Sequence, residues 1–166
     1  MAVRRILLLG NPILRKRCST VRDFSLKETR TTIADLRDTL EDFRKRRGFG
    51  RGIAAPQIGS TLRVIFIRLG GLAALINPKI LKRSTQMIEL WDDCFSFPDI
   101  LVKVRRHRRI EISYVDEAGE RKILKAGDAL SELLQHEIDH INGVLAIDRA
   151  VTKRDIILRS EFPRLS

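Results

Sequence analysis

Gln135-His136-Glu137-Ile138-Asp139-His140 is an HExxH stretch, and the rest of the sequence is interpreted around it. On a helix, two positions four residues apart project from one face with Cβ atoms roughly 5–6 Å apart, so His136 and His140 can place two ring nitrogens on one metal ion. Glu137 follows the first histidine, where its carboxylate can take a proton from a water molecule on that ion. The stretch therefore predicts a helix that supplies two metal ligands and a base.

Apolar residues recur with helical spacing around the HExxH stretch. At about 100° per residue, the leucines and isoleucines of residues 130–141 fall on one side and most polar residues fall on the other. Glu137 lies within the apolar stripe, where a carboxylate is costly unless it is paired or its pKa shifts. A metal ion with its water would compensate that cost, whereas the plainer alternative is two helical histidines beside a satisfied core glutamate. Asp128 is suited to begin this helix and Gly143 to follow its end.

Length and composition favour one globular domain over residues 1–166. The chain has 166 residues, of which 43% are hydrophobic, and this size accommodates a single core. Two cysteines do not make a disulfide framework and favour a reducing compartment. No apolar run approaches the length of a membrane span, and the run from Ile6 to Leu9 is too short for a signal peptide. We expect a cytoplasmic protein with no membrane partner.

The formal net charge of +11 favours anionic partners. Two basic runs carry much of this charge, namely residues 44–47 together with Arg51, and residues 103–109. Such charge attracts RNA, the ribosome surface or acidic lipid over long range. Residues 150–166 form a further basic tail, in which three apolar residues at 156–158 can pack. Solvated basic faces are the alternative interpretation of each run.

The remaining periodicities predict an α+β fold. Apolar positions from Leu26 to about Arg47 keep helical spacing, and the glycine-rich residues 48–59 follow as a loop whose backbone can approach a strand or a ligand closely. Short runs rich in Val, Ile and Phe predict strands. These strands span residues 62–69, 72–76, 85–91, 100–104, 110–115 and 121–124, the last two as a hairpin. We therefore expect antiparallel sheets packed around a central HExxH helix.

A catalytic metal of this kind usually has three protein ligands and one open position, so the third ligand decides the class of enzyme. The metzincin pattern is disfavoured, because Ala146 stands where its last histidine would be. Glu161, twenty-one residues past His140, has the spacing of a thermolysin-like metalloprotease. His107 lies among four arginines, whose field opposes cation binding, whereas Cys94 has carboxylates and aromatics beside it. Residue patterns leave both Glu161 and Cys94 open, and a buried structural thiol is the plain alternative for Cys94.

Three motifs together resemble those of the peptide deformylase family. Gly50-Arg51-Gly52-Ile53-Ala54-Ala55-Pro56-Gln57 is similar to GxGxAAxQ, Cys94-Phe95-Ser96 falls where the family has EGCLS, and residues 135–140 match QHExDH. They occur in the family's order, and Gly10-Asn11-Pro12-Ile13-Leu14-Arg15 is similar to the family's start, so the likeness covers nearly the whole chain. The resemblance implies hydrolysis of the N-formyl group from formyl-methionine at the start of nascent peptides, with release of formate.

The resemblance also implies a metal site and a proton carrier. One divalent ion would be held by Cys94, His136 and His140, with ferrous iron as the usual native ion and zinc, nickel or cobalt as ions that can replace it in purified protein. Glu137 would carry a proton from the metal-bound water to the leaving amine. Such an ion lowers the pKa of its water toward about 7, which makes the scheme chemically coherent.

The groups that meet the substrate are implied in the same way. Gln57 and the backbone N–H of Phe95 would donate to the developing oxyanion, and each donor of this kind can be worth roughly 3–4 kcal/mol. Gly52 and Ile53 would contact the peptide. Asp93 stands where the family has glycine, so we expect a carboxylate close to the substrate that narrows the cleft or selects among substrates.

Two other functions stay open at this stage. One is an HExxH metalloprotease that uses Glu161 as its third ligand. The other is a catalytically altered relative of the deformylases that binds the ribosome or RNA. The charge of +11 suggests it, as do Asp92 and Asp93 in place of the family's Glu-Gly.

Overall fold

The computed structural model describes residues 2–68 and 71–165 of the chain. Its α-helices are α1 (Lys27–Arg47) and α2 (Asp128–Ile141). Its strands are β1 (Gly52–Ala54), β2 (Val64–Arg68), β3 (Leu72–Arg83), β4 (Met87–Asp93), β5 (Ile100–His107), β6 (Arg109–Val115), β7 (Arg121–Gly127) and β8 (Ile156–Leu158). Short 3-10 helices are η1 (Pro12–Arg15), η2 (Ala55–Ile58), η3 (Ala146–Arg149) and η4 (Arg159–Leu165). Leu69, the last residue of one predicted strand, and Ser166, the end of the predicted tail, lie outside the described residues.

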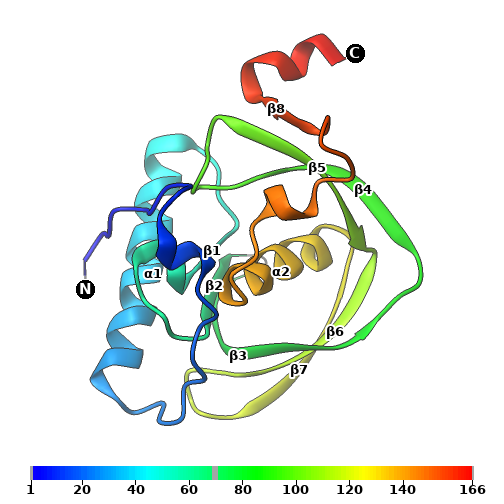
Figure 1. Cartoon of the computed structure of the whole chain (residues 1–166). Coiled ribbons are helices and arrows are strands. Elements are labelled where there is room, and N and C mark those ends of the chain that lie inside the picture. The colour runs from blue at the N-terminus through cyan, green and yellow to red at the C-terminus, as the bar shows by residue number, and fades with distance from the viewer. Residues whose placement is uncertain (1, 69–70, 166) are drawn as a thin grey trace.

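The strands form two antiparallel sheets, which confirms the predicted α+β fold. The larger sheet has the order β1-β2-β3-β6-β7, and the smaller one has the order β4-β5-β8. The predicted hairpin is the β6–β7 pair, in which Val115 lies opposite Arg121. Strand β8 closes the smaller sheet by pairing with the start of β5, so the C-terminal segment lies along its edge (Figure 1).

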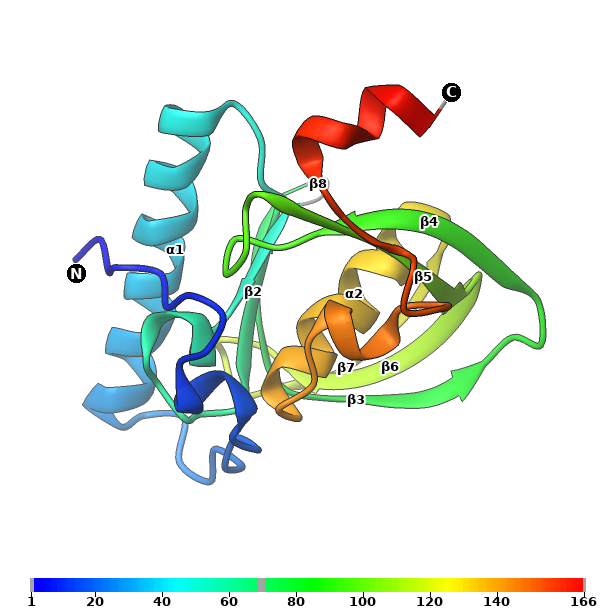
Figure 2. The same ribbon diagram turned by 45° about the horizontal axis from the view of Figure 1, so that its top comes forward.

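The HExxH helix α2 runs between the two sheets (Figure 2). Every residue from Ser131 to Ile141 is buried, including both histidines and Glu137. Leu134 and Ile138 pack against Ile65 and other apolar residues of the larger sheet. Seven of these eleven buried residues are polar, so their polar groups must be satisfied by partners within the protein or by a bound group.

Helix α1 covers the opposite face of the larger sheet. Its residues Leu36 and Leu40 join a second hydrophobic cluster with Val64 and Phe66 of β2. Because successive strand residues face opposite sides of a sheet, β2 buries one set of side chains against each helix. This explains why its sequence is continuously apolar instead of alternating.

Strand β3 continues where the sequence predicted an end at residue 76. Its pairing with β6 shifts register between Ile76 and Lys79, so the Asn77-Pro78 pair is accommodated in a bulge. Asn77 has a φ of 52° and its side chain bonds both the N–H and the carbonyl of Val21, at 2.9 and 2.8 Å. The prediction was wrong because proline removes one ladder donor, and a bulge tolerates that loss without ending the strand.

The start of α2 differs by one residue from the prediction, whereas its end agrees. The N-cap position is Gly127 and not Asp128, whose carboxylate instead accepts a hydrogen bond from Arg108 Nε at 2.8 Å. Gly143 follows the helix with a φ of 76°, as predicted for the residue past its end.

Candidate metal centre

Three buried side chains converge between the sheets. His136 and His140 come from α2, and Cys94 comes from the turn that follows β4. Cys94 Sγ lies 3.2 Å from His140 Nε2, and one donor atom from each of the three residues lies within 4.8 Å of the other two. One thiolate and two imidazoles are the donors that zinc and other divalent transition metals bind. The residues present therefore fit a metal ion.

Two unpaired polar atoms lie beside these donors. Glu137 Oε2 and His140 Nδ1 are buried and have no hydrogen-bond partner among the described residues. Buried polar atoms are nearly always satisfied in folded proteins, so such atoms call for an ion, a water molecule or a substrate group. Glu137 Oε2 is available to a group bound at the site, whereas His140 Nδ1 is the ring nitrogen away from Cys94 and needs a partner other than the ion.

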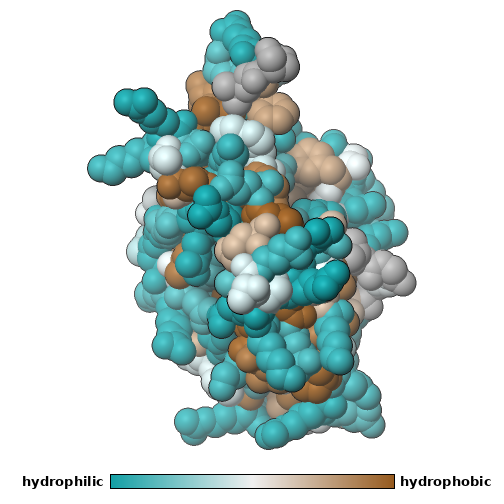
Figure 3. Space-filling view, turned by 90° about the vertical axis from the view of Figure 1, so that its right-hand side faces the viewer, coloured by the Kyte–Doolittle hydropathy of each residue, from teal (hydrophilic) through white to brown (hydrophobic). Residues whose placement is uncertain are grey.

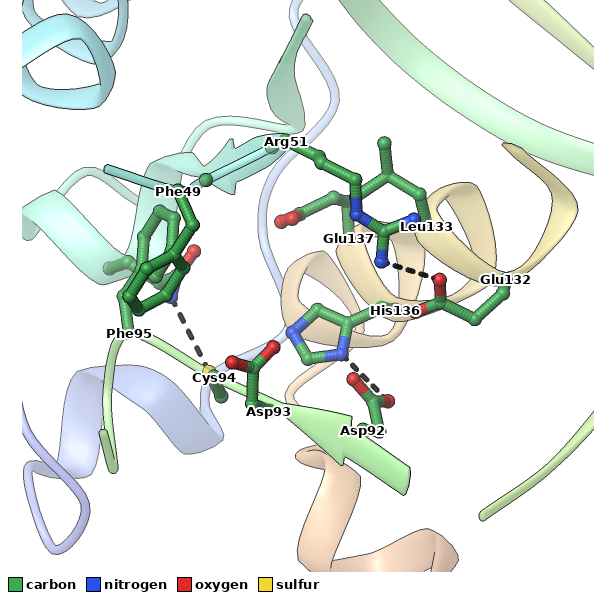
Figure 4. Close-up of a pocket in the computed structure, with 13 residues that line it drawn as sticks. Phe49, Arg51, Asp92, Asp93, Cys94, Phe95, Glu132, Leu133, His136 and Glu137 are labelled. Atoms are coloured by element: carbon green, nitrogen blue, oxygen red, sulfur yellow. Dashed lines mark hydrogen bonds and ion pairs between the residues drawn. The ribbon is translucent and has the colours of Figure 1, made fainter. Parts of the chain in front are cut away.

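His136 is oriented by a carboxylate behind it. Its Nδ1 lies 3.0 Å from Asp92 Oδ2, which leaves Nε2 free to face the centre (Figure 4). Burial alone would raise the pKa of Asp92, but the charges and hydrogen bonds of His136 and Arg106 outweigh it and lower that pKa to about 2. Arg106 is itself buried and also contacts Asp139 of α2. This network fixes the ring orientation of His136, as carboxylate partners do for metal-bound histidines.

Glu137 occupies a space that exists because residue 52 is glycine. A Cβ atom at Gly52 would lie 2.6 Å from Glu137 Oε1 and 3.0 Å from Leu133 Cδ1. Strand β1 thus passes directly over the carboxylate and encloses it. Burial raises the pKa of Glu137 to about 7, in the range suited to a group that both accepts and returns a proton.

The side chain of Gln57 faces the cysteine. Its Oε1 accepts a hydrogen bond from the N–H of Ala54 at 2.9 Å, so its amide NH2 points toward Cys94 Sγ at 3.6 Å and Ser96 Oγ at 3.3 Å. The N-terminal segment holds both η2, which carries Gln57, and the turn after β4, which carries Cys94 and Ser96. The N–H groups of Leu7 and Leu9 donate to the carbonyl oxygens of Gln57 and Ser96, each at 2.8 Å.

A cavity of about 320 Å³ opens beside these groups. It is lined by residues 49–52, Gln57, residues 92–95, Glu132, Leu133, His136 and Glu137 (Figure 4). The ring of Phe95 stacks on Phe43 of α1 with centroids 3.9 Å apart, which packs the turn after β4 against α1. The cavity is therefore a substrate-sized recess with the candidate base, two of the three candidate ligands and a hydrogen-bond donor on its walls.

The structure brings most of the predicted site residues together, with two exceptions. Ile53 does not line the cavity, because its side chain is fully buried in the cluster between α1 and the larger sheet. Glu161 lies in η4, where it pairs with Arg164 at 2.7 Å, and it belongs to neither group of potential metal donors within residues 2–68 and 71–165. The metalloprotease alternative therefore lacks its third ligand. His107, also considered, has its Nδ1 on Ser84 O at 2.8 Å.

Several cavity residues were not singled out from the sequence. Glu132 is buried and pairs with Arg51 at 2.6 Å, and with Asp92 and His136 it forms a second group of potential metal donors. Arg51 already pairs with the carboxylate of Glu132, and Arg106 with that of Asp92. This second group of donors is therefore less suited to a cation. Glu132 precedes His136 by four residues, a spacing that places it on the histidine's side of the helix.

Fold and donor set are those of one class of protein, the HExxH metallohydrolases, with Cys94 as the candidate third ligand. Among the described residues, no helix has the length and apolar character needed to cross a membrane.

Comparison with known proteins gives the family. The polypeptide deformylase family model matches residues 3–155. The chain is 35% identical to a peptide deformylase of Thermotoga maritima over 159 residues, covering 95% of this chain and 93% of that protein. It is 41% identical to a peptide deformylase of Acidothermus cellulolyticus over 150 residues, covering 90% and 79% of the two chains.

Solved structures agree with the sequence comparison. A crystal structure of the peptide deformylase from Thermotoga maritima has a TM-score of 0.84, covering 92% of this chain and 100% of that one. One from Synechococcus elongatus, in complex with actinonin, has a TM-score of 0.83 at 34% identity, covering 90% and 80%. The chain belongs to the peptide deformylase family, whose members are metalloenzymes that remove the formyl group from the N-terminal methionine of nascent polypeptides. The predicted family, activity and class of substrate are confirmed.

Proposed function

We propose that Cys94, His136 and His140 hold one divalent metal ion and that deformylation takes place in the adjoining cavity. The observation that carries this proposal is the convergence of the three donor atoms within 4.8 Å, beside a buried Glu137 whose Oε2 has no partner among the described residues. Ferrous iron is the proposed native ion, and zinc, nickel or cobalt would occupy the same donors in purified protein.

The ion would lower the pKa of a water molecule and polarise the formyl carbonyl. Glu137 accepts the proton of the attacking water and delivers it to the leaving amine of methionine, a role supported by its raised pKa of about 7. The Gln57 amide and the backbone N–H of Phe95 donate to the oxyanion that develops on the formyl group. The hydrogen bond from Ala54 to Gln57 Oε1 holds that amide in the required direction.

The formylated peptide would lie along β1. Gly52 lines the cavity and offers backbone groups without a side chain. Ile53 would contribute through its backbone alone, since its side chain is buried in the core. Asp93 lies on the opposite wall, at the end of β4.

We further propose that residues 1–166 act as one catalytic domain in the cytoplasm and that basic surface residues contact the ribosome. The run at residues 103–109 supplies fewer free charges than its sequence indicates, because Arg106 is buried and Arg105 pairs with Glu89 at 2.6 Å. The face to the right in Figure 1 is largely hydrophilic, with hydrophobic residues in small separate areas (Figure 3). The net charge of +11, and not this hydropathy, is what favours an anionic partner. Ribosome co-sedimentation that falls steeply with salt would support this contact, and salt-independent sedimentation would contradict it.

The test of the catalytic proposal is formate release from formyl-Met-Ala-Ser by protein purified without oxygen and loaded with ferrous iron. Wild-type protein should release formate. Glu137→Gln should keep one metal ion per chain and lose about 10²–10⁴-fold in rate. Glu117→Gln, an exposed carboxamide substitution in the β6–β7 turn, is the matched control and should leave the rate unchanged.

Two outcomes would contradict the proposal in different ways. Normal turnover by Glu137→Gln would remove Glu137 as the proton carrier. No formate from wild-type protein shown to hold one metal ion would favour the altered, ribosome-binding relative.

A further inference from the structure

The mouth of the cavity carries a carboxylate that the metal centre does not use. Asp92 and Asp93 are consecutive residues of β4, so their side chains leave opposite faces of the strand. Asp92 is buried and faces Arg106 and His136, whereas the side chain of Asp93 is 41% exposed and lines the cavity (Figure 4). The side chain of Asp93 is thus accessible to a substrate in the cavity.

An arginine from the C-terminal segment holds this carboxylate. Arg159, the first residue of η4, reaches Asp93 Oδ2 through Nη2 at 2.7 Å. Its Nε donates to Pro98 O at 2.9 Å, and its backbone N–H donates to Asp99 O at 2.8 Å. Two hydrogen bonds therefore fix the guanidinium beside Asp93 and a third fixes the backbone of Arg159, although Arg159 follows Asp93 by 66 residues.

The same guanidinium also reaches the opposite wall. Its central carbon lies 5.9 Å from the ring centre of Phe49, which lines the cavity from the segment between α1 and β1. Phe162 of η4 packs edge-on against Trp91 of β4 at 5.8 Å, so the segment is anchored on both sides of Arg159. Arg159 does not itself line the cavity, but it contacts two residues that do, Phe49 and Asp93.

The charges around the mouth are arranged in pairs. Besides Asp93 with Arg159, the cavity contains Arg51 with Glu132, and Glu132 is almost fully buried. A peptide held by its formyl-methionine end must leave the cavity through this mouth. The side chains that follow methionine therefore pass near Asp93 and Arg159. Both of these residues are about two-fifths exposed, so their charges can attract or repel a charged peptide side chain.

We propose that Asp93 and Arg159 determine the charge preference of the enzyme for the residues that follow formyl-methionine. Paired, they keep the mouth nearly neutral and let acidic and basic peptides enter alike. Unpaired, either residue would favour peptides of the opposite charge. This inference rests on the proposed function, since it takes the cavity to be the substrate site.

The test compares kcat/KM for formyl-Met-Lys-Ser and formyl-Met-Glu-Ser, with formyl-Met-Ala-Ser as the neutral reference. Wild-type protein should treat the two charged peptides within about twofold of each other. Arg159→Gln should favour the lysine peptide by about fivefold, and Asp93→Asn should favour the glutamate peptide by a similar factor. The double variant should return to the wild-type ratio, and both single preferences should shrink in high salt.

Two further variants separate charge from structure. Arg159→Lys keeps the positive charge and should keep the wild-type ratio. Arg164→Gln removes a positive charge from the same 3-10 helix, where Arg164 pairs only with Glu161 among the described contacts, and should change nothing. Thermal unfolding of each variant shows whether the fold is retained.

The inference is overturned if Asp93→Asn and Arg159→Gln shift the peptide ratio in the same direction, or if neither shifts it. If each single variant lost activity equally on all three peptides, the Asp93–Arg159 pair would have only a structural role, and the inference would also fail. Failure of the proposed function would look different, because wild-type protein would then release no formate from the neutral peptide.

Discussion

Gly52→Ala should inactivate the enzyme while leaving the metal in place. The added Cβ would lie 2.6 Å from Glu137 Oε1, whereas ordinary contacts begin at 3.4 Å. The carboxylate must therefore move by about 0.8 Å, the difference between those two distances, and a displacement near 1 Å can cost about 10²-fold in rate. Leu133 Cδ1 at 3.0 Å must also give way, so the free energy of unfolding should fall by about 1–3 kcal/mol.

The assay is formate release from formyl-Met-Ala-Ser, with metal content measured on the same sample and stability measured by urea unfolding. We expect a fall of about 10²-fold in kcat with one metal ion per chain retained, because Glu137 is not among the three ligands. Gly127→Ala is a suitable control. A Cβ there would have Arg109 Cγ at 3.8 Å as its nearest contact, and the φ of Gly127 is −131°.

Activity of Gly52→Ala within about twofold of wild type would refute the reasoning, since proton transfer depends on placement within a fraction of an ångström. Loss of metal along with activity would also count against it, because that result would make Glu137 or its surroundings part of the metal site.

Three other predictions concern the ligands and the buried network. Cys94→Ser should weaken metal binding by more than about tenfold, measured by competition with a chelator, because a serine hydroxyl is a poorer ligand than a thiolate. Arg106→Leu should lower the free energy of unfolding by about 3–5 kcal/mol in urea, because it leaves Asp92 and Asp139 buried with one fewer positive partner. Glu161→Ala should keep full metal content and activity, since the ion pair of Glu161 with Arg164 is exposed and its loss costs about 0–1 kcal/mol. Loss of metal would instead support the metalloprotease alternative.

The sequence predicts the features that depend on local periodicity. Helix α2 and its two histidines follow from the HExxH spacing and an apolar stripe, and these need no knowledge of the rest of the chain. The alternation and apolar runs also predict six of the strands, β2 to β7, with errors at their ends. Strands β1 and β8 were missed, because β1 lies in a glycine-rich segment predicted as a loop and β8 in a short apolar run of the basic tail. The early end assigned to β3 shows the limit, because a bulge at Asn77 depends on a side chain that bonds Val21 far away in sequence.

Contacts between distant segments could not be predicted in the same way. Nothing local in the sequence pairs Asp93 with Arg159, or selects Arg106 from a run of arginines for burial behind His136. Such partners are chosen when sheets and helices pack, because only then are the charges removed from water and forced to compensate one another. The sequence predicted Cys94 as the third metal ligand only through a family resemblance. Residue patterns alone could not decide between Cys94 and Glu161.

The enclosure of α2 has a consequence for motion. A helix buried from Ser131 to Ile141 can exchange its amide hydrogens with solvent only through large-scale opening, so both histidines belong to the slowest-moving part of the chain. Cys94, in contrast, lies on a turn at the end of a strand. We expect ions of different radius to be accommodated by small displacements of that turn, while the helix stays fixed. Replacement of one metal by another should then change reactivity without changing the hydrogen-exchange pattern of α2.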